Sequence, residues 1–219
     1  MNTSPTSQNY GTLEGAYAHF NAALFGGQLS DCLITVQRHK GAYGYFSGDR
    51  FGKVGSPTET TDEIAMNPAH FNGRSMEETL STLVHEMAHL WQHRFGKRPR
   101  KAYHDKQWAA KMREIGLIPS DTGAPGGKET GQKMSHYIAP SGAFELACAE
   151  WLKVNAGILY HDRAGDDEAT AKLRKKKAAS KTKYVCPDCD AAAWGKPGLN
   201  LICGDCACQM KDDQEVDDG

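Results

Sequence analysis

The chain has 219 residues, of which 39% are hydrophobic and 24% are charged, and its formal net charge is -1. This length suits one domain of ordinary size with a small attachment, and the balanced charge gives no sign of a polyanionic partner. No run approaches the roughly 18 apolar residues of a membrane span, and residues 1–10 lack the pattern of a secretory signal. We therefore expect a cytoplasmic protein that does not enter a membrane.

The first 70 residues predict a helix followed by short strands. Residues 1–9 are polar and expected to be disordered, whereas apolar residues recur at helical spacing over residues 10–25. Gly26 and Gly27 end that helix. Short strand-like runs separated by turn-forming residues follow at 32–36, 42–46 and 63–66. We expect these strands to form a small antiparallel sheet.

The strongest helical pattern begins at Ser75. Ser75 and Glu78 fit a capping box, in which each side chain satisfies a free backbone N–H of the other residue. Apolar residues then repeat at helical spacing, namely Leu80, Leu83, Val84, Met87, Leu90 and Trp91. Gly96 is the expected end of the helix. Downstream, the pattern predicts a helix at 104–114, a loop at 119–142 and a core helix at 143–154.

His85-Glu-Met-Ala-His89 is an HExxH sequence inside this helix. Residues four apart lie on one face, about 6 Å apart along the axis, so both imidazoles can bind one Zn²⁺. Glu86 is placed to act as general base on a metal-activated water without binding the metal. The competing interpretation is a pair of surface histidines on a charged helix, which the capped amphipathic pattern disfavours.

A third ligand is needed, and the best candidate is His104, which begins the next predicted helix after a basic loop. His93 continues the face of His85 and His89, but it is about 12 Å from His85 along the axis and is expected to lie at the rim. Glu145 and Glu150 remain alternatives, although both stand in an apolar segment.

The composition changes after residue 161. Residues 162–183 are highly charged and read as a linker, and the acidic residues 211–219 read as a disordered tail. Between them, residues 184–210 hold two C-x2-C pairs, Cys186 with Cys189 and Cys203 with Cys206. This spacing predicts a structural Cys₄ zinc site in a zinc ribbon, because a module this small has too little core to fold alone.

Three further cysteines need no metal. Cys208 lies two residues beyond the last predicted ligand and is expected to be free. Cys32 and Cys148 stand in apolar runs and are expected to be small core residues.

Several of these pieces, in this order, resemble the SprT-like family, which includes the DNA–protein crosslink protease Spartan. The resemblance rests on Ala-Ala-Leu-Phe-Gly-Gly-Gln-Leu at 22–29, on Thr82-Leu-Val-His-Glu-Met-Ala-His89 and on His104-Asp-Lys-Gln-Trp108. Asp105 stands where the family usually has Gly, and Trp108 where it usually has Phe. The resemblance covers residues 10–160, and 184–210 as well, because many bacterial members carry a C-terminal zinc ribbon.

The resemblance implies an α+β, zincin-like metallopeptidase domain over residues 10–161. Its helices would surround a small antiparallel sheet, with HExxH on the active-site helix. His85, His89 and His104 would hold a catalytic Zn²⁺, with Glu86 as the catalytic residue, and the cysteine module would hold a second, structural Zn²⁺. The expected substrate is a protein or peptide, and the expected state is a monomer.

Nucleic acid is a second expected partner. Lys175, Lys176 and Lys177 lie in a basic run beside the ribbon, and Trp194 could stack on unpaired bases of single-stranded DNA. The competing interpretation is that these charges only keep a linker solvated. The family resemblance favours DNA and therefore an association with the nucleoid. Residues His136 and Tyr137 are weaker candidates for polarising a substrate carbonyl.

The alternative function is a zinc-ribbon protein of transcription or DNA processing with a non-catalytic peptidase fold. Glu86 argues against it, because a scaffold that only holds zinc has no need of a general base at that position.

Overall fold

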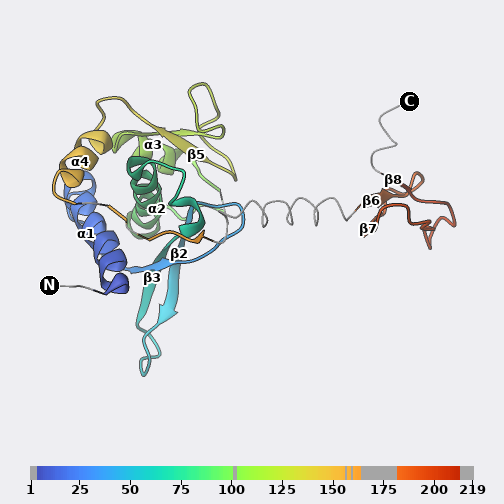
Figure 1. Ribbon diagram of the computed structural model, residues 1–219, viewed down its shortest axis with the longest axis horizontal. Helices are drawn as coiled ribbons and strands as arrows, with labels where there is room; N and C mark the ends of the chain where they lie inside the picture. Colours follow the sequence, from blue (N-terminus) through green and yellow to red (C-terminus); the bar gives the residue numbers. More distant parts are fainter. Residues whose placement is uncertain (1–3, 101–102, 156, 159, 164–181, 213–219) are drawn as a thin grey trace. The chain divides into compact units, whose positions relative to one another are not determined.

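The computed structural model describes residues 4–100, 103–155, 157–158, 160–163 and 182–212 (Figure 1). The chain divides into two compact units, Met1–Asp162 and Arg163–Gly219. Among the described residues, no helix is long and apolar enough to cross a membrane.

The first helix, α1 (Pro5–Phe25), begins earlier than the sequence pattern suggested. Ser4 caps it by accepting a hydrogen bond from the Ser7 N–H at 3.2 Å, and Pro5 occupies the first turn, where its missing N–H costs nothing. The expectation of disorder is therefore wrong for residues 5–9, because polar composition concealed a capping signal. The helix ends as predicted at Gly26, which is left-handed with φ 63°.

The main sheet consists of β1 (Leu33–Val36), β2 (Gly44–Gly52) and β3 (Thr60–Met66), in the order β1-β3-β2. β2 and β3 are antiparallel, but β1 pairs with β3 in parallel, from Leu33 opposite Glu63 to Val36 opposite Met66. The prediction of a wholly antiparallel sheet was therefore wrong. β3 is the most buried strand and takes the centre, and strand spacing alone could not reveal that order.

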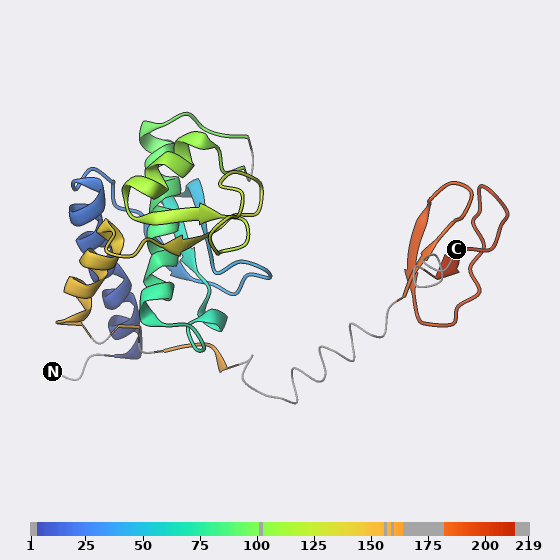
Figure 2. The same ribbon diagram turned by 90° about the horizontal axis from the view of Figure 1, so that it is seen from above.

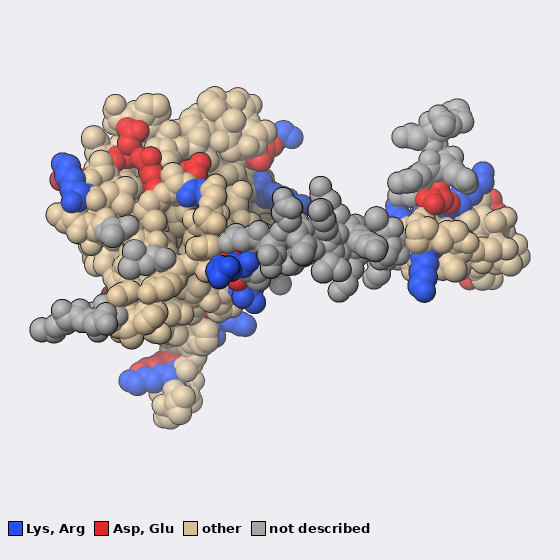
Figure 3. Space-filling view, viewed as in Figure 1, with Lys and Arg blue, Asp and Glu red and all other residues tan. Residues whose placement is uncertain are grey.

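The ends of β2 and β3 form a hairpin that projects from the first unit (Figures 1 and 3). Its tip carries an ion pair between Lys53 and Glu59 at 2.6 Å. The register shifts between Ser47 and Phe51, so the hairpin contains a bulge. After β3, a single 3-10 turn, η1 (Pro68–His70), leads toward the next helix.

The central element is α2 (Met76–Phe95), which contacts β2, β3, α1, α3 (Lys106–Glu114) and α4 (Ala143–Leu152). Figure 2 shows it between the α1/α4 pair and the strands. The capping box is present as expected, with Ser75 Oγ accepting from the Glu78 N–H and the Glu78 carboxylate accepting from the Ser75 N–H. Because neighbours surround α2, residues on almost every face of it are buried.

Residues 119–142 are mostly loop, as predicted, but the segment also contains parts of two short strands that the sequence did not predict. β4 (Leu117–Ser120) and β5 (Ser135–Ile138) form a two-stranded antiparallel sheet, with Leu117 opposite Ile138. A turn at Gly116, with φ 84°, connects α3 to β4. A Cβ at Gly116 would lie 2.8 Å from the backbone nitrogens of Ala143 and Phe144, so only glycine lets α4 approach this closely.

One core holds the first unit together. It gathers apolar side chains from α1, β3, α2, α3 and α4, including Leu13, Phe20, Ile64, Leu83, Met87, Met112 and Phe144. Cys148 is fully buried in this core and Cys32 packs against it, as predicted. Phe20 and Phe144 stack with ring centroids 5.5 Å apart and thereby join α1 to α4.

The second unit contains β6 (Thr182–Val185), β7 (Ala192–Gly195) and β8 (Lys211–Asp212), in the antiparallel order β7-β6-β8. Its buried apolar residues are few: Tyr184, Cys186, Cys203 and Met210. Lys211 and Asp212 belong to a strand rather than to the predicted tail, whose residues 213–219 lie outside the described part.

Replacing Phe144 with Ala should lower the free energy of unfolding of the first unit by about 3–5 kcal/mol, because it removes a buried ring and leaves a cavity. Urea unfolding followed by the helical circular-dichroism signal measures this loss. Leu146→Ala, on the same helix but 61% exposed, should change the value by no more than about 0.5 kcal/mol. Equal losses in the two variants would contradict the assigned core.

Candidate functional site

The HExxH sequence lies in the buried middle of α2. His85 and His89, one turn apart, have ring centroids separated by 5.2 Å, and His85 is only 8% exposed. The structure thus brings both rings to one side of the helix, as their four-residue spacing predicts.

His104 reaches the same place from the segment before α3. Its backbone pairs with Gly131 in a two-residue bridge, and its Nδ1 lies 3.1 Å from the Gly131 carbonyl oxygen. A carbonyl can only accept, so Nδ1 carries the proton and Nε2 keeps its lone pair. His104 precedes α3 rather than beginning it, because Asp105 caps that helix by accepting from the N–H groups of Gln107 and Trp108.

Asp105 also fixes the position of α3 against α2. Its carboxylate accepts a hydrogen bond from Gln92 Nε2 at 2.8 Å, and Gln92 is buried in the last turns of α2. The carboxylate where the SprT-like family usually has glycine therefore serves as a helix cap and an inter-helix tie.

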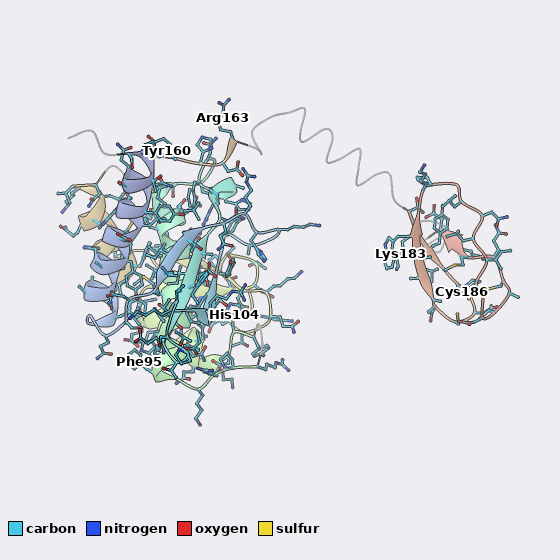
Figure 4. All side chains as sticks on the ribbon, turned by 90° about the horizontal axis from the view of Figure 1, so that it is seen from below. Phe95, His104, Tyr160, Arg163, Lys183 and Cys186 are labelled. Atoms are coloured by element: carbon cyan, nitrogen blue, oxygen red, sulfur yellow. The ribbon has the colours of Figure 1, made fainter. Side chains whose placement is uncertain are left out.

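Three histidines thus converge: nitrogens of His85, His89 and His104 all lie within 4.8 Å of one another. Trp108, which is fully buried, packs against all three, stacking on His89 with centroids 5.2 Å apart. Figure 4 shows His104 within the body of the first unit and Phe95, at the end of α2, at its edge. The cluster can hold one metal ion in the manner of a three-histidine site.

Burial keeps these imidazoles neutral. It lowers the pKa of His89 to about 3, the pKa of His85 well below its usual range, and the pKa of His104 to a smaller extent, and the neighbouring histidines add to the effect on His85 and His89. A neutral imidazole is the form that binds metal, so little competition from protons remains near neutral pH.

Glu86 lies one residue after His85 and is only 6% exposed. Burial raises the pKa of its carboxyl to about 8, and a hydrogen bond from the backbone of Phe46 in β2 partly offsets that rise. Glu86 is not among the residues whose ligand atoms converge with the histidines. It is therefore a buried carboxyl that lines the same cleft as the histidines and, without a metal ion, keeps its proton near neutral pH.

The alternative third ligands lie elsewhere. His93 hydrogen-bonds to Asp49 at 3.1 Å and does not belong to the group formed by His85, His89 and His104. Glu145 accepts from the Ser141 N–H and Glu150 pairs with Lys153, and neither belongs to a converging metal-binding group among the described residues.

His93 belongs to a second cluster with Asp49 and Asp62. Arg94 bonds to the fully buried Asp62 at 2.6 Å, and Arg98 bonds to Asp49 at 3.1 Å. Two guanidinium groups thus balance the two carboxylates, and the cluster is an ion-pair network that ties β2 to the end of α2 rather than an open cation site.

His136 is held differently from what the sequence suggested. Its Nδ1 lies 3.0 Å from Nδ1 of His85 and its Nε2 lies 2.8 Å from Ser81 Oγ. Sequence reasoning missed this partnership. The signal for Ser81 was its position four residues before His85 on the same helix face, but nothing in the sequence placed β5 beside it.

The cluster opens into a large cleft of about 1290 Å³. Gly44, Tyr45 and Phe46 of the edge strand β2 line it, together with Tyr137 of β5. Its basic side chains, Arg74, Arg98, Arg100 and Lys133, outnumber its carboxylates, Glu78, Glu86 and Asp121. A space above the roughly 300–1,000 Å³ of small-molecule pockets suits an extended polymer.

In the second unit, the four predicted cysteines converge. The sulfur atoms of Cys186, Cys189, Cys203 and Cys206 all lie within 4.8 Å of one another, and Figure 4 labels Cys186. Cys208 is not disulfide-bonded, but its Sγ lies 3.3 Å from that of Cys186, so it contacts the cluster. Four thiols in this arrangement fit a closed, tetrahedral metal site.

The predicted nucleic-acid residues are only partly described. Lys175, Lys176 and Lys177 lie outside the described residues. Trp194 stands on β7 opposite Lys183 and is 66% exposed.

The pKa of Glu86 predicts how the metal-free protein responds to pH. The carboxyl holds its proton up to about pH 8 when folded but releases it near its ordinary pKa of 4.5 when unfolded. The unfolded state therefore binds fewer protons between these values, and this group's contribution to stability is lost as the pH rises through that window.

Glu86→Gln cannot lose a proton, so this decrease in stability with rising pH should be absent in the variant. After chelation, its free energy of unfolding relative to the parent chain should increase steadily from pH 5 to pH 8. Urea titrations followed by circular dichroism test this, since all the described helices lie in the first unit. A constant difference across the range would rule out a raised pKa.

Known proteins share parts of this sequence. A model of the SprT-like family matches residues 13–126, which is more than half of the chain. A relative from Salmonella typhimurium, described as an uncharacterized protein in the mucB 3′ region, is 49% identical over 61 residues, which are 27% of this chain and 80% of the relative. No solved structure matches. The resemblance seen in the sequence is thus confirmed, and the chain belongs to the SprT-like family.

Proposed function

We propose that the first unit is a zinc-dependent endopeptidase of zincin-like architecture. One observation carries the proposal: the buried carboxyl of Glu86 lies next in sequence to a cluster of three neutral histidines at the cleft. A scaffold that only holds a metal gains nothing from burying a carboxyl there, since the burial costs free energy.

The donor set fits zinc. His85, His89 and His104 offer three neutral nitrogens, and three protein ligands leave a coordination position for water and substrate, as in catalytic zinc sites. When bound, zinc would supply Lewis-acid activation, lowering the pKa of a water toward about 7. With the metal in place, the Glu86 carboxylate would accept a proton from the attacking water and return it to the leaving amine.

The cleft supports a peptide substrate. β2 is an edge strand of the sheet, and its residues Gly44–Phe46 line the cleft beside Glu86. An extended peptide can lie along such an edge and present its carbonyl to the site. Trp108, which is fully buried, packs against all three histidine rings and holds them together.

The second unit favours an action on proteins associated with DNA. Its cysteine cluster fits a structural zinc, which would stabilise a module with few buried apolar residues. The exposed ring of Trp194 can stack on an unpaired base. We therefore propose that the ribbon directs a cytoplasmic, nucleoid-associated, monomeric peptidase to proteins on single-stranded DNA.

The alternative proposal is a DNA-binding protein without peptidase activity. It requires only the cysteine cluster and Trp194. It does not explain the histidine cluster or the raised pKa of the buried Glu86 carboxyl.

Replacing Glu86 with Gln should lower peptide cleavage about 100-fold or more, because the general base is lost while the metal ligands remain. The measurement is the rate of cleavage of a denatured, fluorescently labelled protein, with and without single-stranded DNA. Metal analysis should still find both zinc ions.

Glu150→Gln is the matched control, because Glu150 lies on the surface of α4 and pairs only with Lys153 among the described residues. It should cleave like the parent chain. Full peptidase activity in the Glu86→Gln variant would refute the peptidase proposal. The absence of zinc at the histidines in the parent chain would also refute it.

Replacing Trp194 with Ala should weaken binding to single-stranded DNA by about 1–3 kcal/mol, since one stacking platform is removed. Fluorescence anisotropy with a labelled oligonucleotide measures the change. Ile202→Ala, at a residue on the same unit with 68% exposure and no aromatic ring, should bind like the parent. Equal binding by all three proteins would contradict the stacking role.

A further inference from the structure

His136 contacts the histidine cluster without being one of the three residues that form it. It lies in β5, mostly buried, with Nδ1 3.0 Å from His85 Nδ1 and Nε2 2.8 Å from Ser81 Oγ. Both of its ring nitrogens are therefore engaged with α2. A ring held in this way has no free nitrogen to present to a substrate carbonyl.

The backbone carbonyl of Glu78 determines which atoms donate in the hydrogen bonds of Ser81, His136 and His85. Ser81 Oγ donates to the Glu78 carbonyl oxygen at 2.9 Å, so the hydroxyl proton is already used. Ser81 can then only accept, and the proton of His136 must stand on Nε2. Nδ1 of His136 is therefore an acceptor, and the proton between the two rings belongs to Nδ1 of His85.

This order settles the tautomer of His85. With its proton on Nδ1, His85 keeps the lone pair of Nε2 for a metal. His104 reaches the same state by another route, since its Nδ1 donates to the Gly131 carbonyl. Metal-binding histidines generally need such a partner at the second nitrogen, which fixes the ring and raises its basicity.

We propose that His136, supported by Ser81, is a positioning residue that sets the tautomer and the orientation of His85 for zinc binding. The proposal rests on the zinc site proposed above. A single segment, from Gly131 to His136, then anchors two of the three histidines in the cluster. It gives the β4–β5 sheet, which the sequence did not predict, a defined role at the site.

The binding of zinc tests this role directly. In His136→Phe, a ring of similar size without nitrogens, the zinc dissociation constant of the histidine site should rise about 10- to 100-fold. Competition with a chromophoric chelator measures it. The Cys₄ site of the same chain serves as an internal reference and should not change.

His136→Asn provides a rescue. Its side-chain oxygen can take the place of Nδ1 and accept from His85, so zinc affinity should return to within a few-fold of the parent value. Ser81→Ala leaves Nε2–H of His136 without its acceptor and should give an intermediate loss. His19→Ala is the matched control, because His19 bonds to the Ala147 carbonyl oxygen and does not line the cleft.

The outcomes separate the two proposals. If the parent chain binds zinc only at the cysteines, the proposed function fails. If it binds zinc at both sites and His136→Phe holds it as tightly as the parent does, the role of His136 alone is refuted. Should the Phe variant lose its helical signal, His136→Ala carries the same expectation, and unchanged affinity there has the same meaning.

Discussion

The structure depends on one constraint: the helix α2 contributes side chains to the hydrophobic core and to the histidine site at the same time. Leu83 and Met87 are fully buried in the core, while His85 and His89 face the cleft from the same two turns. Only a helix enclosed on nearly all sides can do both. The elements that enclose α2, from α1 and α4 to the sheet and α3, therefore also determine the environment of the histidines.

That enclosure explains the electrostatics of the site. Burial disfavours the charged form of each group. It therefore lowers the pKa values of the histidines and raises the pKa of Glu86. A divalent cation would reverse the balance for Glu86, since a nearby positive charge favours the carboxylate. Neutral imidazoles can bind a cation without first losing a proton. The hydrogen bonds at Nδ1 of His85 and His104 leave the Nε2 atoms of both rings free to bind it.

The two units are stabilised in different ways. The first buries apolar side chains from helices and strands in a continuous core, whereas the described part of the second, residues 182–212, buries four apolar side chains. In the second unit, a metal ion held by the closed set of four thiols would supply much of the folding free energy. Cys208, whose Sγ lies 3.3 Å from that of Cys186, adds a fifth sulfur beside the four that converge.

The sequence by itself determined what short-range periodicity and spacing can encode. The capped helix from Ser75, the pairing of His85 with His89, and the two C-x2-C pairs all follow from residues a few positions apart. The tertiary structure alone decided the parallel pairing of β1 with β3, the β4–β5 sheet and the contact between His136 and His85, and it brought His104, the candidate that the sequence offered, to the other two histidines. These pairings join residues separated by tens of positions, and their free energy comes from burial and backbone hydrogen bonds that exist only once the chain has folded.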